Sequence, residues 1–355
     1  MKNNKLYING LSSISAQPEN AVFEGIINTY HQNIIPAVSP DFKSFIPAMA
    51  LRRMSRAIRM GLTSAKIALK QAGMTKPDAI ITGTGEGCKQ DTEKFLEAIL
   101  NQDENLLTPT AFIQSTHNTI GGQLAQNLEC TGYNVTYTHN SASFESALMD
   151  AQLLFLEDRE INSVLVGGVD ELSKKITSFM YLDSQLKEEE ISNPDLLKSN
   201  SSGTITSEGA HFFSISTEKS EKTYAELIDV SVFQAKTSKD VSEKILNVLQ
   251  LNNYTIEDIE LVILGNNGDN RFDHFYDHLQ KGLFSEKVQL AYKHLTGDYK
   301  TVSGYAVWLA CKIFKTGSIP EIFKLNDVTC QNPKTILLYN QYLGDNHSIM
   351  ILSSN

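Results

Sequence analysis

The chain of 355 residues is 41% hydrophobic and 20% charged, which is typical of a packed globular protein with one large core or two fused halves. Its 31 Lys and Arg residues stand against 41 Asp and Glu residues, so the formal net charge is −10. This charge argues against nucleic-acid binding driven by net electrostatic attraction, because a polyanionic partner would need a local basic patch.

Neither the cysteines nor the hydropathy pattern indicates an exported or membrane protein. The four cysteines form no CxxC pair, so we expect neither a zinc site nor a disulfide framework from Cys88, Cys130, Cys311 and Cys330. The basic start is followed by an apolar run too short for a signal peptide, and no window offers ~18 consecutive apolar residues for a membrane span. We therefore expect a soluble, cytoplasmic protein.

The first strongly periodic segment, residues 52–73, predicts a helix. Its apolar residues recur at spacings of three, four or seven, and Gly73 stands where a C-cap is expected. The opposite face carries four arginines, namely Arg52, Arg53, Arg56 and Arg59. These arginines form either a solvated face or a local docking patch for an acidic carrier or partner protein.

Short β-type runs recur along the rest of the chain, and helical patterns separate several of them. The runs cover residues 78–85, 134–140, 163–169, 210–216, 224–233, 261–267 and 288–294, and a strand pair is expected around 343–347. This alternation predicts an α/β architecture with covered sheets rather than a sandwich.

Two helical segments are apolar on nearly every side, so they are predicted to lie in the middle of the protein. They cover residues 143–156 and 305–314, and each is entered from a strand through small residues. One such helix per half suggests an internal duplication. The polar stretch 187–202 is typical of a surface loop, which divides the chain into halves of residues 1–200 and 201–355.

The turn before the first of these helices could present a nucleophile. Ser141 stands at the turn, directly after the strand of residues 134–140, and His139 precedes it by two residues. Such a turn exposes a side chain, and the helix N-terminus supplies unpaired N–H groups and positive potential that stabilise an oxyanion.

The segments around this turn resemble β-ketoacyl synthases of the thiolase fold, and the resemblance runs over most of the chain. Gly132 and residues 134–140 are similar to the family's Gly-Pro and the strand that follows it, and Asn140-Ser141-Ala142 is similar to its Ala-Cys-Ala turn. Residues 143–156 are similar to the family's buried helix, and residues 167–171 to its Gly-Gly-x-Asp/Glu strand end. Its later Gly-Glu-Gly-Ala, Lys-x-x-x-Gly-His and C-terminal Gly-Gly-Thr-Asn motifs are similar to residues 203–210, 293–304 and 344–348. The resemblance implies a duplicated α-β-α-β-α core of five layers, with two mixed sheets and buried central helices.

The departures from the family pattern concern the residues that carry the chemistry. Ketosynthases use a Cys as the acyl-accepting nucleophile and two His residues to decarboxylate the malonyl unit and stabilise the enolate. The resemblance assigns Ser141 to the Cys, Asp298 to one His, and Leu264 or Asn266 to the other, while Lys293 matches the family. The residues implied to border the acyl substrate are His139, Asn140, Gly304, Leu343 and Gly344.

These replacements oppose condensation. A serine hydroxyl without a neighbouring base stays protonated and is a poor nucleophile. An aspartate at position 298 would place negative charge where an enolate or oxyanion must form, and the loss of one oxyanion donor typically costs ~100- to 1000-fold in rate. We therefore do not expect decarboxylative condensation by this chain alone.

The resemblance within the family is to the chain-length-factor subunits of type II polyketide and aryl-polyene pigment systems. It implies a degenerate subunit that pairs with a Cys-bearing ketosynthase, or with a second copy, along the edge strand of residues 134–140, and that shapes the acyl tunnel. The further partner would be an acyl carrier protein, whose phosphopantetheine carries the acyl group in fatty-acid or polyketide synthesis. No other cofactor is implied.

Two alternatives stay open. Ser141 with His139 or His117 as base would form a Ser-His arrangement suited to an acyltransferase or thioesterase, provided that the strand continues through Ser141 so that 139 and 141 point the same way. A free-standing small-molecule binder could also reuse the tunnel. We expect Cys88 to be inert, and we favour a polar helix face over a metal site for the cluster Asp269, Asp273, His274, Asp277 and His278.

Overall fold

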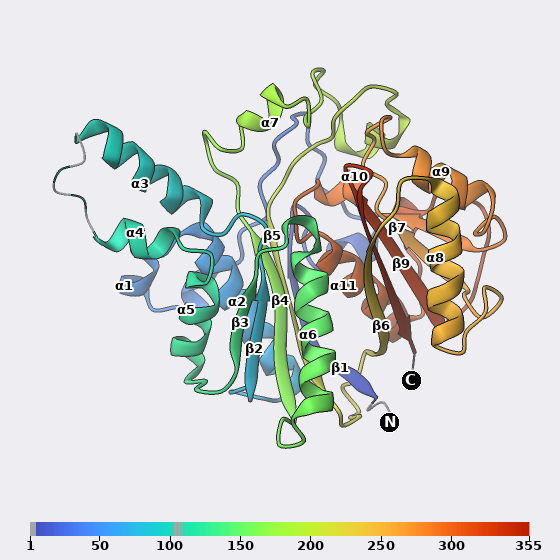
Figure 1. Cartoon of the computed structure of the whole chain (residues 1–355), viewed down its shortest axis with the longest axis horizontal. Helices are drawn as coiled ribbons and strands as arrows, with labels where there is room; N and C mark the ends of the chain where they lie inside the picture. The colour runs from blue at the N-terminus through green and yellow to red at the C-terminus, as the bar shows by residue number, and fades with distance from the viewer. Residues whose placement is uncertain (1–4, 103–104, 106, 108, 355) are drawn as a thin grey trace.

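A ten-stranded mixed sheet runs through the computed structural model, which describes residues 5–102, 105, 107 and 109–354 (Figure 1). The strand order is β3-β2-β4-β5-β1-β6-β10-β9-β7-β8. The strands are β1 (Leu6–Ile14), β2 (Ala79–Gly83), β3 (Asn134–Tyr137), β4 (Ser163–Asp170), β5 (Gly209–Ser216), β6 (Ala225–Gln234), β7 (Leu261–Leu264), β8 (Val288–Ala291), β9 (Thr335–Tyr342) and β10 (Asn346–Ser353).

The sheet consists of two halves with the same internal order, β3-β2-β4-β5-β1 and β8-β7-β9-β10-β6. In each half the first three strands pair in parallel and the last two join antiparallel. The internal duplication predicted from the two buried helices is therefore confirmed by the topology.

The two halves meet along β1 and β6. Leu6–Ile8 of β1 pairs antiparallel with Ala225–Leu227 of β6, so the two expected sheets are one continuous hydrogen-bonded sheet. β5 lies beyond residue 200 but pairs with β1 and β4, so in the structure the first half extends to Ser216. The polar stretch at 187–202 is a surface excursion before that last strand.

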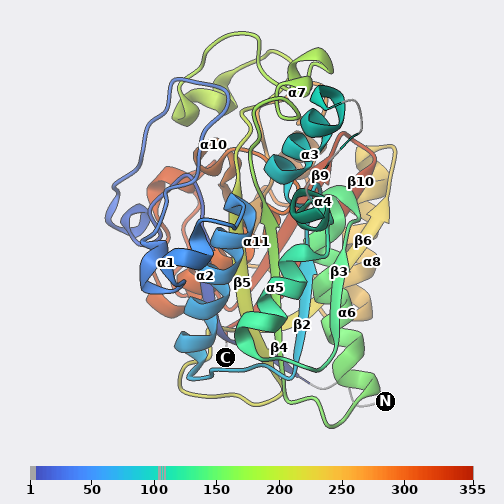
Figure 2. The same cartoon turned by 90° about the vertical axis from the view of Figure 1, so that its left-hand side faces the viewer.

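The helices complete five layers, as Figures 1 and 2 show. α6 and α11 lie between the halves, because α6 contacts β2, β4 and β6 while α11 contacts β1, β5 and β9. α2 and α5 cover the outer face of the first half, and α8 and α9 cover that of the second. The helices are α1 (Ala48–Leu51), α2 (Arg56–Ala72), α3 (Lys89–Asn101), α4 (Pro109–Ser115), α5 (Thr119–Leu128), α6 (Ser143–Glu157), α7 (Phe179–Leu182), α8 (Ser238–Leu251), α9 (His274–Lys281), α10 (Lys293–Thr296) and α11 (Ser303–Thr316).

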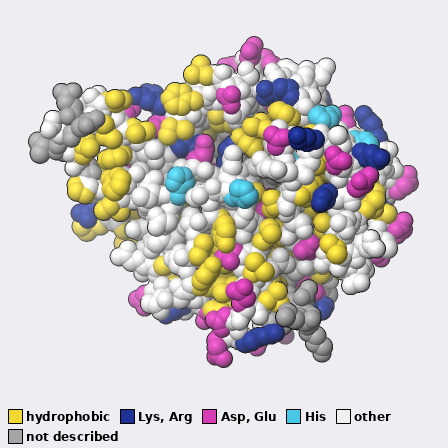
Figure 3. All heavy atoms as spheres, viewed as in Figure 1, with side chains coloured by type: hydrophobic (Ala, Val, Ile, Leu, Met, Phe, Trp, Pro, Cys, Tyr) yellow, Lys and Arg dark blue, Asp and Glu magenta, His cyan; other side chains and the backbone are white. Residues whose placement is uncertain are grey.

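The two central helices differ in burial. α11 is buried along its first nine residues, as predicted. α6 buries one face but exposes Leu153 (53%) and Leu156 (36%), because β3 is the end strand and no described element covers the outer side of the helix there. Figure 3 shows hydrophobic side chains gathered over this part of the surface. The prediction of a helix buried all round therefore holds for α11 and for only one face of α6.

The N-terminal elements show how local chemistry sets the boundaries. α2 begins at Arg56, later than predicted, because the Ser55 hydroxyl caps it by accepting from the Ile58 N–H. It ends at Gly73, whose φ of 78° is the left-handed cap that the sequence predicts. α2 packs so closely on β1 that a Cβ at Gly10 would overlap the Ala68 carbonyl oxygen. Within the described part of the chain, no helix combines the length and apolarity needed to cross a bilayer.

Candidate active site

The predicted turn forms between β3 and α6 and rests directly on β2. A Cβ at Gly83 of β2 would lie 2.6 Å from the Ser143 carbonyl carbon, so only glycine permits this approach. The residue with the left-handed backbone is Asn140, with φ of 50°, and the Ser143 hydroxyl donates to its carbonyl oxygen at 2.6 Å. The sharp turn therefore centres on the exposed Asn140, and Ser141 follows it in a 3-10 turn.

Ser141 is buried, at 8% exposure, against the second half of the sheet. It borders a cavity of about 10 Å³ that is also lined by Gln341, His347 and Ser348. Both ring nitrogens of His347 are engaged: Nδ1 lies 2.9 Å from the Tyr339 hydroxyl and Nε2 lies 3.1 Å from the Ala235 carbonyl. Burial lowers the pKa of His347. His347 therefore offers Ser141 no free base.

The Ser-His arrangement is not assembled. β3 ends at Tyr137, so the condition that the strand continue through Ser141 is not met. His139 is exposed, and its Nδ1 lies 3.4 Å from the Ser146 hydroxyl. His117 is exposed and packs on Gly87, and among the described residues neither histidine hydrogen-bonds to Ser141.

A buried ion pair lies at the second candidate position. Lys293, the first residue of α10 and 1% exposed, places its Nζ 3.0 Å from Asp298 Oδ1. Asn267 Nδ2 donates to the other carboxylate oxygen of Asp298 at 2.8 Å. Asn266 is directed elsewhere and lines a separate polar cavity of about 530 Å³. Asn267, rather than Asn266, therefore stands beside Asp298, an offset of one residue that the repeated Asn in the sequence conceals.

Glu145 connects the turn to this ion pair. It lies one helical turn after Ser141 on α6, is fully buried, and accepts from the Ser348 hydroxyl at 3.0 Å. Burial raises the pKa of Glu145, and the positive charge of Lys293 opposes that rise. In the sequence, Glu145 stands out as the one carboxylate in the first turn of a helix whose other first-turn residues are small or apolar.

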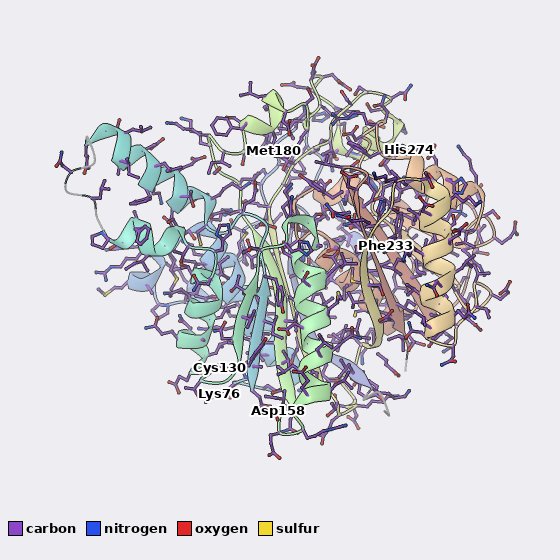
Figure 4. The ribbon with its side chains drawn as sticks, viewed as in Figure 1. Lys76, Cys130, Asp158, Met180, Phe233 and His274 are labelled. Atoms are coloured by element: carbon purple, nitrogen blue, oxygen red, sulfur yellow. The ribbon has the colours of Figure 1, made fainter. Side chains whose placement is uncertain are left out.

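The main cavity of the site, here called the central cavity, has a volume of only about 40 Å³. It lies at the junction of the two halves, and Leu343 is one of the residues that border it. Its lining is dominated by charged and amide side chains, and the described lining residues include neither cysteine nor histidine: Glu86, Lys89, Asp170, Glu171, Met180, Gln185, Thr204, Thr206, Ser207, Asn267, Asp269, Phe272, Asp298, Tyr299, Lys300, Tyr342 and Leu343. Figure 4 labels Met180, which borders this cavity, and His274, which borders the larger one.

The remaining glycine positions have packing roles. Gly344 follows Leu343 in the turn between β9 and β10, where both have left-handed φ angles of 74° and 51°. Gly304, in the first turn of α11, packs on His211, since a Cβ there would lie 2.7 Å from the His211 Cβ. Gly304 and Gly344 are absent from the lining of the central cavity, whose described members are given above.

Two consecutive carboxylates at the end of β4 hold the loops around the central cavity. Asp170 accepts five hydrogen bonds, from Thr84, Gly85, Glu86 and twice from Thr301. Glu171 accepts the Ala57 N–H at the start of α2 and the Gln90 N–H at the start of α3, both at 2.8 Å. One carboxylate thus satisfies free donors at two helix N-termini.

Glu171 should make the stability of the protein depend on pH. Burial raises its pKa from 4.5 to about 7, so the folded state holds this proton more tightly than the unfolded state does. The resulting stabilisation is present below pH 4.5 and is lost as the pH rises through about 7. Relative to Glu171→Gln, the free energy of unfolding of the wild type should fall by roughly 1–3 kcal/mol between pH 5 and 8, at about 1.4 kcal/mol per pKa unit.

Urea denaturation across this pH range measures the difference. The exposed variant Glu257→Gln serves as control and should run parallel to the wild type. Parallel curves for Glu171→Gln as well would contradict the assignment.

The described residues also give the surroundings of three other groups that the sequence singles out. Cys88 is buried in the outer core of the first half, and burial raises its pKa to about 12, so it is inert as expected. No group of three or more His, Cys, Asp or Glu residues in the described chain could hold a metal ion. Arg56 is bound to Glu208, Ser39 and Ala37, so one of the four arginines is paired with a carboxylate.

The duplicated five-layer topology and the turn entering α6 define the class as a thiolase-like ketosynthase fold. A family model described as "Beta-ketoacyl synthase, N-terminal domain" matches residues 13–218. The chain therefore belongs to the β-ketoacyl synthase family. No curated protein sequence matches it.

Solved structures similar to the chain share its fold at low sequence identity. The ishigamide ketosynthase/chain length factor superposes with a TM-score of 0.80 at 15% identity, covering 99% of this chain and 100% of that one. A β-ketoacyl synthase from Burkholderia phymatum STM815 gives 0.81 at 14%, with the same coverage. A type II polyketide ketosynthase in complex with its acyl-carrier protein, AntDE:AntF, bound to the hexaketide, gives 0.75 at 15%, also with 99% and 100% coverage.

Proposed function

We propose that this chain is a catalytically degenerate ketosynthase subunit that pairs with an active, Cys-bearing ketosynthase and shapes the acyl tunnel of the pair. The observation that carries the proposal is the central cavity, whose described lining offers carboxylates, lysines and amides but neither thiol nor imidazole. Condensation needs a nucleophile that accepts the acyl group and donors that stabilise the enolate. Among the described lining residues, neither the family's thiol nor its imidazoles stand in this cavity.

The ion pair beside the central cavity supports the same conclusion. The positive charge of Lys293 is already paired with Asp298, and Asn267 donates its amide to the same carboxylate. Both donors are therefore committed to an internal anion and are not free for an anion that forms on a substrate. A role in shaping the tunnel depends on the shape of this site and needs no free donor.

The edge of the sheet supports pairing. β3 is the end strand and, within the described chain, pairs only with β2, so one side of it is open to another strand. Beside it lie Tyr133 (40% exposed), Leu153 and Leu156, an exposed apolar surface next to an open strand edge. Exposed apolar patches of this kind mark protein interfaces.

The partners in this proposal are inferred from the solved structures that are similar to this chain. One of these is a ketosynthase/chain length factor, and another is a ketosynthase bound to an acyl-carrier protein. By analogy, the partner of this chain is a Cys-bearing ketosynthase, and the acyl group reaches the pair on the phosphopantetheine of a carrier protein.

Co-expression with a Cys-bearing ketosynthase tests the proposal, because native mass spectrometry should detect a complex of one copy of each. Leu153→Asp should weaken this complex at least tenfold, since a charge would be buried without a partner in the interface. The purified chain alone should show no malonyl-dependent condensation.

The control for the interface variant is Leu251→Asp, which places the same charge on the exposed end of α8, 74% exposed, in the other half. It should leave pairing unchanged. A homodimer that ignores the ketosynthase, or condensation by the chain alone, would overturn the proposed function.

A further inference from the structure

One lysine, Lys300, lies across the central cavity. It belongs to the loop between α10 and α11, and its aliphatic stem rests on the backbone of Gly85, the second residue after β2. A Cβ at Gly85 would overlap the Cβ and Cγ of Lys300, so the stem and this turn are in close contact. The stem thus occupies the space between a loop of the second half and a turn of the first.

The amine end of Lys300 is held on the opposite wall. Its Nζ donates to the Tyr342 hydroxyl and lies 3.7 Å from the centroid of the Tyr342 ring, a cation–π geometry. The Tyr342 hydroxyl in turn donates to Gln185 Oε1 at 3.2 Å. A continuous chain of contacts therefore runs from the turn after β2, through Lys300 and the end of β9, to the loop after α7.

The charges around Lys300 favour this position. Burial lowers the pKa of the amine, while the carboxylates Glu86, Asp298 and Asp170 act in the opposite direction. Moving the ammonium group out would leave these carboxylates with fewer counter-charges in a partly desolvated site. The lysine is therefore held inside the cavity by electrostatics as well as by contact.

The remaining space is small. The cavity of about 40 Å³ has room for one or two water molecules, whereas pockets that bind small molecules usually measure ~300–1000 Å³. The side chains of Lys300 and Tyr342 border the space that remains.

We propose that Lys300 is a plug that closes the central cavity of this subunit to an acyl-pantetheine thioester. The proposal rests on the proposed function, since a closed cavity keeps the thioester from binding unproductively to a subunit that cannot condense it. With the cavity closed, every acyl group stays on the partner ketosynthase, and this chain contributes only residues that line the acyl tunnel of the pair.

Binding of hexanoyl-pantetheine to the isolated, folded chain tests the plug by isothermal titration calorimetry. The wild type should show no binding at millimolar concentration, and Lys300→Ala should bind at least tenfold more tightly. Lys300→Met is the matched control, because it keeps the length of the side chain and removes the charge. The packing of its stem on Gly85 should hold it in place, so the cavity should remain closed. Tyr342→Ala removes the opposite wall of the same contact and should also open the cavity.

Circular dichroism and the thermal midpoint establish that each variant is folded. Binding by the wild type as tight as by Lys300→Ala would overturn the plug, and so would the absence of binding by both folded opening variants. Binding by Lys300→Met equal to that by Lys300→Ala would also overturn it, because the side-chain volume would then not matter. None of these measurements uses the partner ketosynthase, so failure of the plug and failure of pairing are separate results.

Discussion

Replacing Lys293 by methionine is expected to lower the free energy of unfolding by about 3–5 kcal/mol, the range found when one partner of a buried ion pair is removed. Lys293 is 1% exposed, and its ammonium group lies 3.0 Å from Asp298. The substitution preserves most of the side-chain volume, so the loss arises from a buried carboxylate without its counter-ion. Urea denaturation at pH 7 measures the change.

Two further variants isolate the origin of this loss. Lys293→Met combined with Asp298→Asn removes both charges, and it should recover most of the lost stability. Lys281→Met breaks an exposed pair with Asp277 on α9 and should cost less than about 0.5 kcal/mol. If Lys293→Met is no more costly than Lys281→Met, the ion pair contributes nothing to the stability of the site.

Replacing Asp170 by alanine is expected to cost at least about 4 kcal/mol, because each buried donor left unpaired costs roughly 1–3 kcal/mol. Asp170 accepts five hydrogen bonds from the turn after β2 and from Thr301. Those donors belong to opposite halves of the chain, so the variant also loosens the junction around the central cavity. Since most domains are stable by only ~5–15 kcal/mol, this loss is a large share of the total stability.

The comparison is Asp150→Ala on α6, which removes a half-buried aspartate that accepts from the Tyr133 hydroxyl at 3.1 Å. That change should cost less than about 1 kcal/mol, because water can replace the lost acceptor. Urea denaturation of both variants gives the difference. An equal cost for the two would show that the hydrogen bonds of Asp170 are not what holds the junction.

The fold was largely predictable because its long elements carry clear patterns. The apolar run of α11, the strand of residues 163–169 and the capping glycine at position 73 each follow from local chemistry. β1 was missed, since residues 6–14 mix polar and small residues and carry Gly10 in the middle. That glycine is required by the approach of α2, a long-range contact that no local pattern reveals.

The site was predictable in its location but not in its contacts. The motifs indicated a turn before α6, which the structure forms, and Asp298, which the structure pairs with Lys293. They could not distinguish Asn266 from Asn267, because a shift of one residue in a loop leaves the motif unchanged while it redirects the side chain. Lys300 was missed for another reason: a lysine in a loop is normally solvated, and only the packing of both halves around it shows that it lies inside.

The position of β1 has a consequence for the synthesis of the chain. β1 is synthesised well before its partners, which are Ala210–Ser216 of β5 and Ala225–Leu227 of β6. The centre of the sheet can close only after β5 and β6 have been made, and contacts so distant in sequence form slowly. Until then the nascent chain carries an unpaired strand, a species prone to aggregation, so folding of this protein is tied to the late emergence of β5 and β6.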